Sequence, residues 1–476
     1  MKLNSEIQAI SSRAILRLAN VLFLGFFGLS LVLVFWQVFQ ANSVGNSPSN
    51  PRTVLASRSI LRGEIFDRNG VPLVVNQSDR QGAVSQHYML PSLAQVVGYN
   101  SSRYGRTGLE SSFNQYLDGS IGIVPGLPAL EKLLGIPRRG DALTLTIDAK
   151  MQQYAAQLLG QHHGAIIVLN PKTGAIHAMV STPYFDPNNL DAKWKTLVAD
   201  PYHPLLNRAT QAVYPPGSVF KLVTAAAALE TGLETPTSQF TCFGDWVIQG
   251  FHISCENPQI PPQLTFQRAL ELSANAIYAQ VAYRMGSQTL ERYAQRFGFD
   301  TVPPIGLPVT PSTLKDTSTP WTSPLLASTG FGQGQLQVTP LQLALITEAI
   351  ANGGTIMTPY LVDHATSPQG VIVYQHTPEP WRRAISPQTA STLTQMMVGV
   401  VNNGSGYNAR IPGIVVAGKT GTAQVGGAAK PHAVFVCFAP AQNPRLAVVV
   451  LVESAGEGAD AAAPIARALL EEGLTH

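Results

Sequence analysis

The sequence predicts an α+β protein preceded by one membrane-spanning helix, and three observations lead to this fold class. An uncharged apolar stretch lies near the N-terminus. Two short apolar strands, residues 165–169 and 175–180, flank a turn, and three more strand-like runs follow residue 414. Between these groups, residues 206–400 are rich in helical patterns. The simplest arrangement is a five-stranded antiparallel sheet with a helical insertion, and helices on both faces because the last strands are too apolar to face water.

Length and composition limit the possible classes of protein. The chain has 476 residues, of which 45% are apolar, so it can bury a large core in two or three domains. Charged residues make up 12% and the net charge is +3. Because phosphate binding requires clustered Lys and Arg, we expect no nucleic-acid partner.

The N-terminal stretch predicts a membrane anchor. No charged residue lies between Arg17 and Arg52, and residues 18–39 are almost wholly apolar, which meets the ~20 residues that a bilayer crossing needs. Lys2 and Arg13 precede the stretch, so the N-terminus is predicted to be cytoplasmic and the rest of the chain extracytoplasmic. The alternative, a cleaved signal peptide, would have a shorter apolar core that ends in small residues.

Three segments follow from these patterns. Residues 1–41 are predicted to form the cytoplasmic stub and the anchor, residues 42–150 a small β-rich domain, and residues 151–476 the larger domain with the five-stranded sheet. Residues 41–58 have the composition of a linker. Asp67-Arg68-Asn69-Gly70 predicts a tight turn, since Asn-Gly adopts positive φ readily.

The three cysteines leave two alternatives open. Cys242 and Cys255 flank residues 246–253, which can form a hairpin, and they are either paired in an oxidising compartment or two reduced, partly buried thiols. Cys437 lies in an apolar strand and is predicted to be core. No Cys/His spacing matches a metal site, so we expect no metal and no cofactor.

The first motif with chemical potential is Ser218-Val219-Phe220-Lys221. It opens a good helix former, so Ser218 and Lys221, three residues apart, share one helix face. A serine becomes a nucleophile when a base takes its proton, and a lysine with a lowered pKa can be that base. The helix start also offers free backbone N–H groups to an oxyanion. Taken alone, the pattern also fits an N-cap serine and a surface lysine.

Two further motifs follow in order along the chain. Ser273-Ala274-Asn275 lies in a tight connection between two helical patterns, where the serine and asparagine side chains can point the same way. Lys419-Thr420-Gly421-Thr422 lies on a predicted strand, where a lysine and two threonines suit a carboxylate and Gly421 allows a ligand backbone to approach the strand edge. A second K-T-G, at Lys172, follows Asn-Pro in a hairpin turn and is expected to be structural.

Together, the three motifs match the S-x-x-K, S-x-N and K-T-G set of penicillin-recognising serine enzymes. The chain resembles the class B penicillin-binding proteins, and in its compact length the actinobacterial-type members. The resemblance extends over nearly the whole chain and includes the anchor, residues 62–70, 108–110, 146–152, 214–221, 332–344 and 351–354, and the terminal strands. It implies the penicillin-binding transpeptidase fold, with residues 42–150 as a non-catalytic domain.

The resemblance also implies a reaction. Ser218 would attack the penultimate D-Ala carbonyl of a peptidoglycan stem peptide, and Lys221 would take its proton. Ser273 would pass a proton to the leaving D-Ala, and Asn275 would bind the substrate's amide. Lys419, Thr420 and Thr422 would bind the terminal carboxylate along the strand at Gly421. The backbone N–H groups of Ser218 and Thr422 would form an oxyanion hole. An amine from a second stem would then attack. β-Lactams would inhibit the enzyme, and a membrane glycan polymerase would be its partner.

Other classes share some of these features. A D,D-carboxypeptidase or β-lactamase-like serine hydrolase would use water in place of the amine, and it would need a carboxylate to activate that water. Carboxylates are scarce near the motifs: Glu271 is close to the second, and none lies between residues 414 and 432. A non-catalytic scaffold would lack a catalytic residue, and a sensor would need a longer cytoplasmic region. The sequence therefore predicts a transpeptidase.

Overall fold

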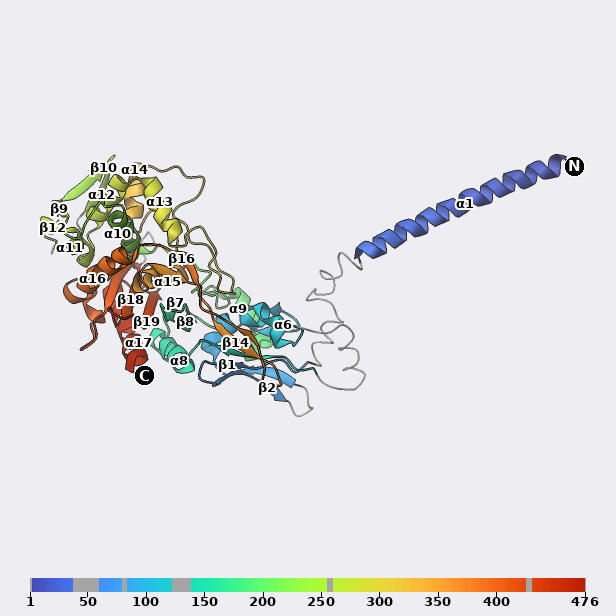
Figure 1. Ribbon diagram of the computed structural model, residues 1–476, viewed down its shortest axis with the longest axis horizontal. Helices are drawn as coiled ribbons and strands as arrows, with labels where there is room; N and C mark the ends of the chain where they lie inside the picture. Colours follow the sequence, from blue (N-terminus) through green and yellow to red (C-terminus); the bar gives the residue numbers. More distant parts are fainter. Residues whose placement is uncertain are drawn as a thin grey trace. The chain divides into compact units, whose positions relative to one another are not determined.

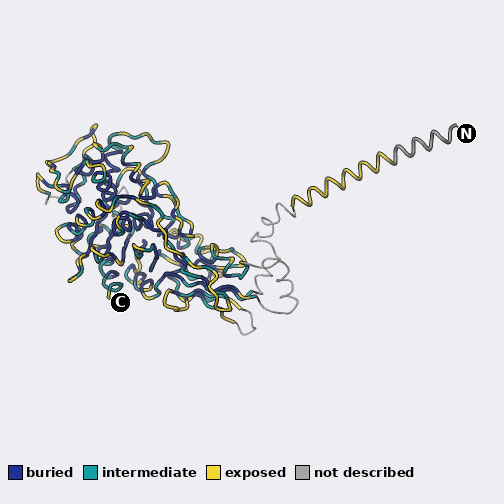
Figure 2. The backbone as a smooth tube through the Cα atoms, in the orientation of Figure 1, coloured by how far each residue is buried: buried dark blue, intermediate teal, exposed yellow. Residues whose placement is uncertain are grey.

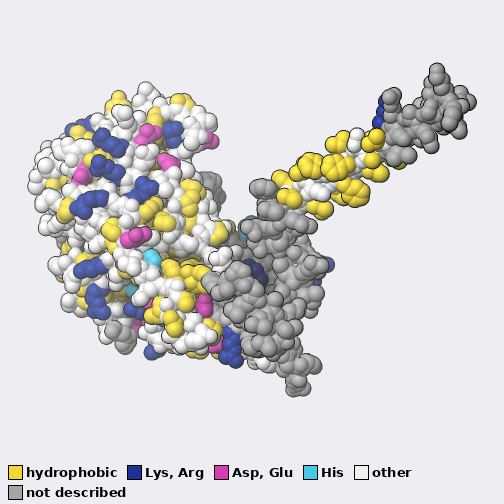
Figure 3. Space-filling model, turned by 45° about the vertical axis from the view of Figure 1, so that its right-hand side comes forward, with side chains coloured by type: hydrophobic (Ala, Val, Ile, Leu, Met, Phe, Trp, Pro, Cys, Tyr) yellow, Lys and Arg dark blue, Asp and Glu magenta, His cyan; other side chains and the backbone are white. Residues whose placement is uncertain are grey.

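The structure, a computed structural model, describes residues 2–36, 60–78, 84–121, 138–254, 260–424 and 430–475. Residues 1–60 with 102–105 form one unit and the rest of the chain another. The first unit contains α1 (Lys2–Val34). Within α1, Leu16–Val34 is a 19-residue stretch of mean hydropathy 2.0, long and apolar enough to cross a membrane. Its side chains are hydrophobic almost throughout (Figure 3). The last residues of the predicted span, 37–39, lie outside the described part.

The five-stranded antiparallel sheet predicted from the sequence is confirmed. Its strand order is β17-β18-β19-β7-β8, so the first two and last three strands of the domain join at β19 and β7 (Figure 1). β17 is an edge strand, which matters below because it carries the K-T-G motif. The strands are β7 (Gly164–Leu169), β8 (Ile176–Thr182), β17 (Ala417–Ala423), β18 (His432–Ala439) and β19 (Leu446–Val452).

Helices cover both faces of this sheet, as its apolar strands require. Alternate residues of β7 face opposite ways: Ile167 belongs to a core shared with α15 (Pro340–Ala351), and Ile166 to a second core shared with α8 (Ala149–Leu159) and α17 (Ala463–Thr475). Figure 2 shows the buried backbone that results along the sheet. Such two-sided burial explains why the strands read as continuous apolar runs.

The insertion between β8 and β17 is largely helical. Its helices are α9 (Leu190–Ala199), α10 (Lys221–Glu230), α11 (Phe266–Glu271), α12 (Asn275–Met285), α13 (Ser287–Arg296), α14 (Ser323–Gly330), α15 and α16 (Pro387–Asn403). The predicted hairpin is present as β10 (Asp245–Ile248) paired with β11 (Phe251–Ser254). Further two-stranded pairs are β9 (Gln239–Thr241) with β12 (Gln263–Thr265), and β13 (Thr355–Met357) with β16 (Pro380–Arg383).

The cysteines differ in their state. Cys242 is disulfide-bonded. Cys255 lies outside the described residues, so its pairing with Cys242 stays a prediction. Cys437 is a free thiol with no exposed surface in β18, and burial raises its pKa, which agrees with the predicted role in the core.

A second sheet takes strands from both sides of residue 150, where the sequence was divided. Its order is β15-β14-β6-β1-β2-β3. Four strands come from the N-terminal region: β1 (Ile65–Phe66), β2 (Pro72–Ser78), β3 (Val84–Tyr88) and β6 (Ala142–Leu145). The other two, β14 (Val362–Thr366) and β15 (Ile372–Gln375), come from the middle of the predicted larger domain. Sequence-local patterns cannot reveal such a pairing, because β14 lies inside the insertion, far from β6 in sequence.

A buried ion pair connects the start of this sheet to α5 (Gly108–Ser112). Arg62 Nε donates to Glu110 Oε2 at 2.5 Å, and Arg62 NH2 donates to the Glu110 carbonyl oxygen at 2.7 Å. The Glu110 side chain has no exposed surface, and its other oxygen accepts from Gln86 Nε2 at 2.9 Å. Removal of one charge would leave the other buried without its counterion.

We therefore expect Glu110→Gln to lower the free energy of unfolding by ~3–5 kcal/mol, because Arg62 keeps its charge in a buried position. The matched control is Glu471→Gln, since Glu471 pairs with Arg467 at 2.9 Å but both side chains are about 40% exposed. That change should cost less than ~1 kcal/mol. Chemical denaturation of the full-length protein in detergent measures both. Equal, small losses would contradict a structural role for the buried pair.

Candidate active site

Ser218 lies in a turn that is pressed against the edge of the five-stranded sheet. It belongs to the 3₁₀ turn Gly217–Phe220, which leads directly into α10. Gly217 has φ of +56°, and a Cβ there would lie 2.7 Å from the Thr422 carbonyl oxygen. A glycine is therefore needed for the turn to approach β17, and that approach brings Ser218 to the K-T-G strand.

Lys221 is not the surface lysine that the first motif alone would also fit, because its side chain has no exposed surface. Its Nζ contacts Ser218 Oγ at 3.0 Å and Asn275 Oδ1 at 2.6 Å. It also contacts the carbonyl oxygen and Oγ of Ser273, at 2.6 and 3.1 Å. Tyr278 places its ring 5.6 Å below Nζ, which further stabilises a buried cation. The S-x-x-K and S-x-N motifs thus meet at one amine.

Ser273 holds a backbone conformation that few residues other than glycine adopt. Its φ is +58°, in the short connection between α11 and α12. Such a conformation costs about 1–3 kcal/mol and persists when its surroundings enforce it. Here the enforcing contacts are the two hydrogen bonds from Lys221 and a third from Lys419, whose Nζ lies 3.0 Å from Ser273 Oγ. The Ser273 hydroxyl therefore lies between two lysine amines.

Lys419 has no exposed surface, and burial lowers its pKa to about 7. Its Nζ has three oxygen partners: Ser273 Oγ, the Thr420 carbonyl oxygen at 2.9 Å and Thr420 Oγ1 at 3.3 Å. Three acceptors match the three protons of an ammonium group. The amine can therefore be charged or neutral near neutral pH, with its charged form held by hydrogen bonds.

The structure gives a second reason for a glycine at position 421, beside the predicted approach of a ligand backbone. A Cβ at this position would lie 2.9 Å from the Pro216 carbonyl oxygen and 3.0 Å from Val219 Cγ2. The glycine therefore makes room for the turn that carries Ser218. On either side of it, Thr420 Oγ1 lies 2.8 Å from Ser405 Oγ, and Thr422 Oγ1 donates to Glu457 Oε2 at 2.6 Å.

The second K-T-G lies where its hairpin context predicted. Lys172 is exposed in the turn between β7 and β8, and its Nζ donates to Asn443 Oδ1. It takes no part in the contacts around Ser218.

Two site residues, Ser405 and Glu457, could not be found by inspection of the motifs. Glu457 follows β19, far from Thr422 in sequence, and the expectation that carboxylates are scarce near the K-T-G motif missed it. The signal was available in the register of the sheet. Thr422 lies opposite Ala433, and Ala433 lies opposite Val452, so the segment after β19 begins near Thr422.

The carboxylate that the sequence did place near the second motif is engaged elsewhere. Glu271 accepts from Arg268 NH1 at 2.7 Å and from Gln267 Nε2 at 3.0 Å. Its side chain lies against α16, where a Cβ on Gly399 would come within 2.3 Å of its Oε1. Glu271 is therefore a structural residue that joins α11 to α16.

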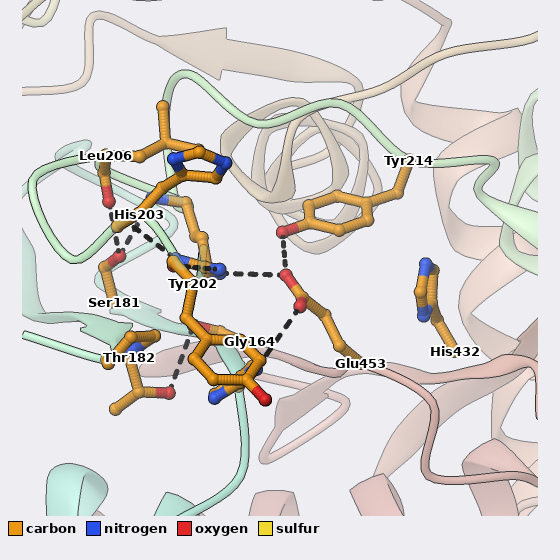
Figure 4. Close-up of polar contacts among 12 residues, drawn as sticks. Gly164, Ser181, Thr182, Tyr202, His203, Leu206, Tyr214, His432 and Glu453 are labelled. Carbon is orange, nitrogen blue, oxygen red and sulfur yellow. Dashed lines mark hydrogen bonds and ion pairs between the residues drawn. The ribbon is translucent and has the colours of Figure 1, made fainter. Parts of the chain in front are cut away.

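A second polar cluster anchors the segment that leads to Ser218. Tyr214 donates its hydroxyl proton to Glu453 Oε1 at 2.7 Å, and Arg208 Nε donates to the same oxygen at 2.8 Å. Figure 4 shows the Tyr214 phenol pointing at the Glu453 carboxylate, with His432 to the other side. Burial first, and the Glu453 charge second, raise the pKa of Tyr214, so its hydroxyl stays a donor. The contact ties the approach to the nucleophile to the end of β19.

Comparison with known proteins defines the family. Residues 164–471 match the penicillin binding protein transpeptidase domain. The chain therefore belongs to the penicillin-binding transpeptidase family. The matched region contains all three motifs and the five-stranded sheet.

Within the family, the chain is similar to class B members over most of its length. The peptidoglycan D,D-transpeptidase PbpA of Mycolicibacterium smegmatis is 37% identical over 472 residues, with 92% of this chain and 94% of that protein covered. The peptidoglycan D,D-transpeptidase MrdA of Escherichia coli K12 is 30% identical over 411 residues, with 78% and 64% covered. Penicillin-binding protein A from M. tuberculosis, solved as a ceftriaxone acyl-enzyme, superposes with a TM-score of 0.81 at 35% identity, with 88% of this chain and all of that chain covered.

The lowered pKa of Lys419 predicts the pH dependence of labelling by penicillin, the ligand after which the family is named. The ammonium charge is present below about pH 7 and is lost as pH rises through that value. The rate constant for labelling should therefore fall above pH 7, if the charge attracts the penicillin carboxylate. Lys419→Arg, whose guanidinium stays charged, should lose this limb. If the rate constant still falls above pH 7 in a folded Lys419→Arg variant, a group other than Lys419 causes that fall.

Proposed function

We propose that this protein is a peptidoglycan D,D-transpeptidase that cross-links stem peptides through an acyl-enzyme on Ser218. The observation that carries the proposal is the continuous set of contacts from Ser218 Oγ to Lys221 Nζ, to Ser273 Oγ and to Lys419 Nζ. A serine within 3.0 Å of a buried amine is the nucleophile–base pair that acyl transfer requires.

The first half-reaction follows from these contacts. Lys221, as the neutral amine, takes the Ser218 proton while Oγ attacks the carbonyl carbon of the penultimate D-Ala. The tetrahedral oxygen is held by the backbone N–H groups of Ser218 and Thr422. The close approach of Gly217 to the Thr422 backbone supports this assignment. The proton then passes through the Ser273 hydroxyl to the leaving D-Ala nitrogen as the C–N bond breaks.

The remaining motif residues are assigned to binding. Lys419, Thr420 and Thr422 hold the terminal carboxylate of the donor peptide along the edge strand β17, at Gly421. Asn275 accepts from Lys221 through Oδ1, which leaves its amide N–H₂ to bind a substrate carbonyl. No step requires a cofactor.

The second half-reaction transfers the acyl group to an amine from a neighbouring stem. As the neutral amine nitrogen bonds to the acyl carbon, it gives one proton through Ser273 Oγ to Lys221. The bond to Ser218 Oγ then breaks, and Oγ takes that proton from Lys221, which ends neutral. A serine hydrolase is the second candidate, and Glu457 beside Thr422 is the observation that favours it, because a carboxylate can activate water.

We further propose where the reaction takes place. The apolar stretch of α1 anchors the chain in the cell membrane as a single span, with the N-terminus cytoplasmic and the transpeptidase domain extracytoplasmic. Residues of the second sheet are then available to a membrane glycan polymerase that supplies nascent strands.

Labelled penicillin tests the nucleophile. The full-length protein in detergent should form a covalent adduct on Ser218 that lasts many minutes, and Ser218→Ala should abolish it. With nascent glycan and its membrane polymerase, the wild type should yield cross-linked peptide dimers. An adduct mapped to another residue by mass spectrometry would refute the assignment. Rapid turnover of penicillin without any dimer would favour the hydrolase.

The two K-T-G copies provide a matched pair. Lys419→Ala should slow acylation by roughly 10²–10³, the loss typical for one oriented charge or donor in a dry site. Lys172→Ala should change it less than about twofold, because Lys172 is exposed and bonds only a surface asparagine among the described residues. Stopped-flow or gel-based labelling measures both rates. Similar losses of acylation rate in the two folded variants would show that the position of a K-T-G motif on a strand or in a turn does not decide its role.

A further inference from the structure

The Glu457 carboxylate is fixed against the K-T-G strand by backbone packing. It accepts from Thr422 Oγ1 at 2.6 Å, and it directly precedes the π-helical turn Gly458–Ala462. Gly458 lies so close to the strand that a Cβ there would approach the Gly421 carbonyl oxygen to 2.5 Å. The contact with Thr422 thus follows from where the turn sits.

The segment that carries Glu457 is also held before and after that residue. At its start, Glu453 is bound by Tyr214 and Arg208, and Ser454 N donates to His432 Nδ1 at 3.0 Å. Further along, Gly456 N donates to the Pro431 carbonyl oxygen at 3.0 Å, and Asn408 Nδ2 donates to the Ala459 carbonyl oxygen at 2.9 Å. Figure 4 shows the Glu453 end of this anchorage.

The charges around the site are divided between two sides. The amines of Lys221 and Lys419 lie together at Ser273, both without exposed surface. Glu457 is exposed and, within the described ranges, supplies the carboxylate that hydrogen-bonds the K-T-G-T strand. An incoming amine is an ammonium ion near neutral pH, since ordinary alkyl amines have pKa values of about 10. Lys419 repels such a cation when it is protonated, and Glu457 attracts it.

We propose that Glu457 binds the ammonium group of the acceptor in the second half-reaction, an inference that rests on the function proposed above. The incoming nitrogen must occupy the place of the leaving nitrogen, because the two half-reactions pass through equivalent transition states at one carbonyl. The bound ammonium first gives one proton to solvent, so that the free amine attacks. The second proton reaches Ser218 Oγ through Ser273 and Lys221. The leaving D-Ala takes with it the carboxylate assigned to Thr420 and Thr422.

One hydroxyl proton then serves both stages. Thr422 Oγ1 carries a single proton, so it donates either to the donor carboxylate or to Glu457. While the donor is bound, the neutral Thr422 hydroxyl faces the donor carboxylate. Once D-Ala has left, the hydroxyl donates to Glu457, and the same place presents a fixed negative charge to a cation. The pocket therefore reverses its preference between the two stages without a movement of the strand.

Glu457→Gln tests this, since it keeps a hydrogen-bond acceptor for Thr422 and removes the charge. Asp460→Asn is the matched control, because Asp460 is an exposed acid in the same turn. The full-length enzyme in detergent is acylated with a thioester analogue of the donor peptide. It is then given either glycinamide, a cation at neutral pH, or hydroxylamine, which is uncharged there. Mass spectrometry gives the ratio of aminolysis to hydrolysis.

In Glu457→Gln, the glycinamide concentration for half-maximal aminolysis should rise about three- to fivefold, the loss of one exposed charge pair. The reaction with hydroxylamine should change less than about twofold. Acylation should not become slower, because the variant has no negative charge beside the donor carboxylate and Thr422. Asp460→Asn should alter neither, and Glu457→Asp should restore part of the preference. For the wild type, added salt should weaken the advantage of glycinamide over hydroxylamine.

Three results would overturn the inference. The first is an unchanged glycinamide concentration for half-maximal aminolysis in Glu457→Gln. The second is an equal loss of aminolysis with glycinamide and with hydroxylamine. The third is slower hydrolysis of the Glu457→Gln acyl-enzyme, which would make Glu457 an activator of water. Failure of the proposed function itself looks different, because the wild type would then form no acyl-enzyme on Ser218 or no amide with any amine.

Discussion

The hydroxyl of Ser273 lies 3.1 Å from Lys221 Nζ and 3.0 Å from Lys419 Nζ, and the rest of the site is arranged around it. Two amines without exposed surface would be very costly if they had no polar partners. Oxygens from three segments far apart in sequence supply those partners: the turn before α10, the connection between α11 and α12, and β17. The positive φ of Ser273 and the glycine at position 217 are local costs that this convergence requires.

The segment after β19 completes this arrangement from outside the motifs. It bonds to Tyr214 through Glu453 and to Thr422 through Glu457, so it contacts both the segment that leads to Ser218 and the K-T-G strand. The interactions differ in kind. Glu453 shares one oxygen between a phenol and a guanidinium, a contact suited to fixing positions. Glu457 is exposed and has a single partner among the described side chains, which suits a group that exchanges partners during a reaction.

Much of this could be predicted from the sequence because the relevant signals are local. The five strands, the helix after Ser218, the hairpin at residues 245–254 and the role of Lys172 in a turn all follow from periodicity and turn residues within short windows. Burial of Lys221 and Lys419 was implied by the chemistry and is present. What failed was long-range. Glu457, Ser405 and the pairing of β6 with β14 depend on strand register, and the second reason for Gly421 depends on a neighbour that touches it from another element.

The pairing of β6 with β14 has a consequence for how the polypeptide matures. Thr146 N bonds to the Leu361 carbonyl oxygen, and the two residues are 215 positions apart. During synthesis, β6 therefore emerges long before its partner and exposes an unpaired edge, the kind of surface that invites mispairing. The N-terminal region cannot finish its sheet as an autonomous nucleus. Its completion instead requires that the helices from α9 to α15 have already been synthesised. Folding of the N-terminal sheet and of the region that carries the three motifs therefore becomes one cooperative event with a high contact order.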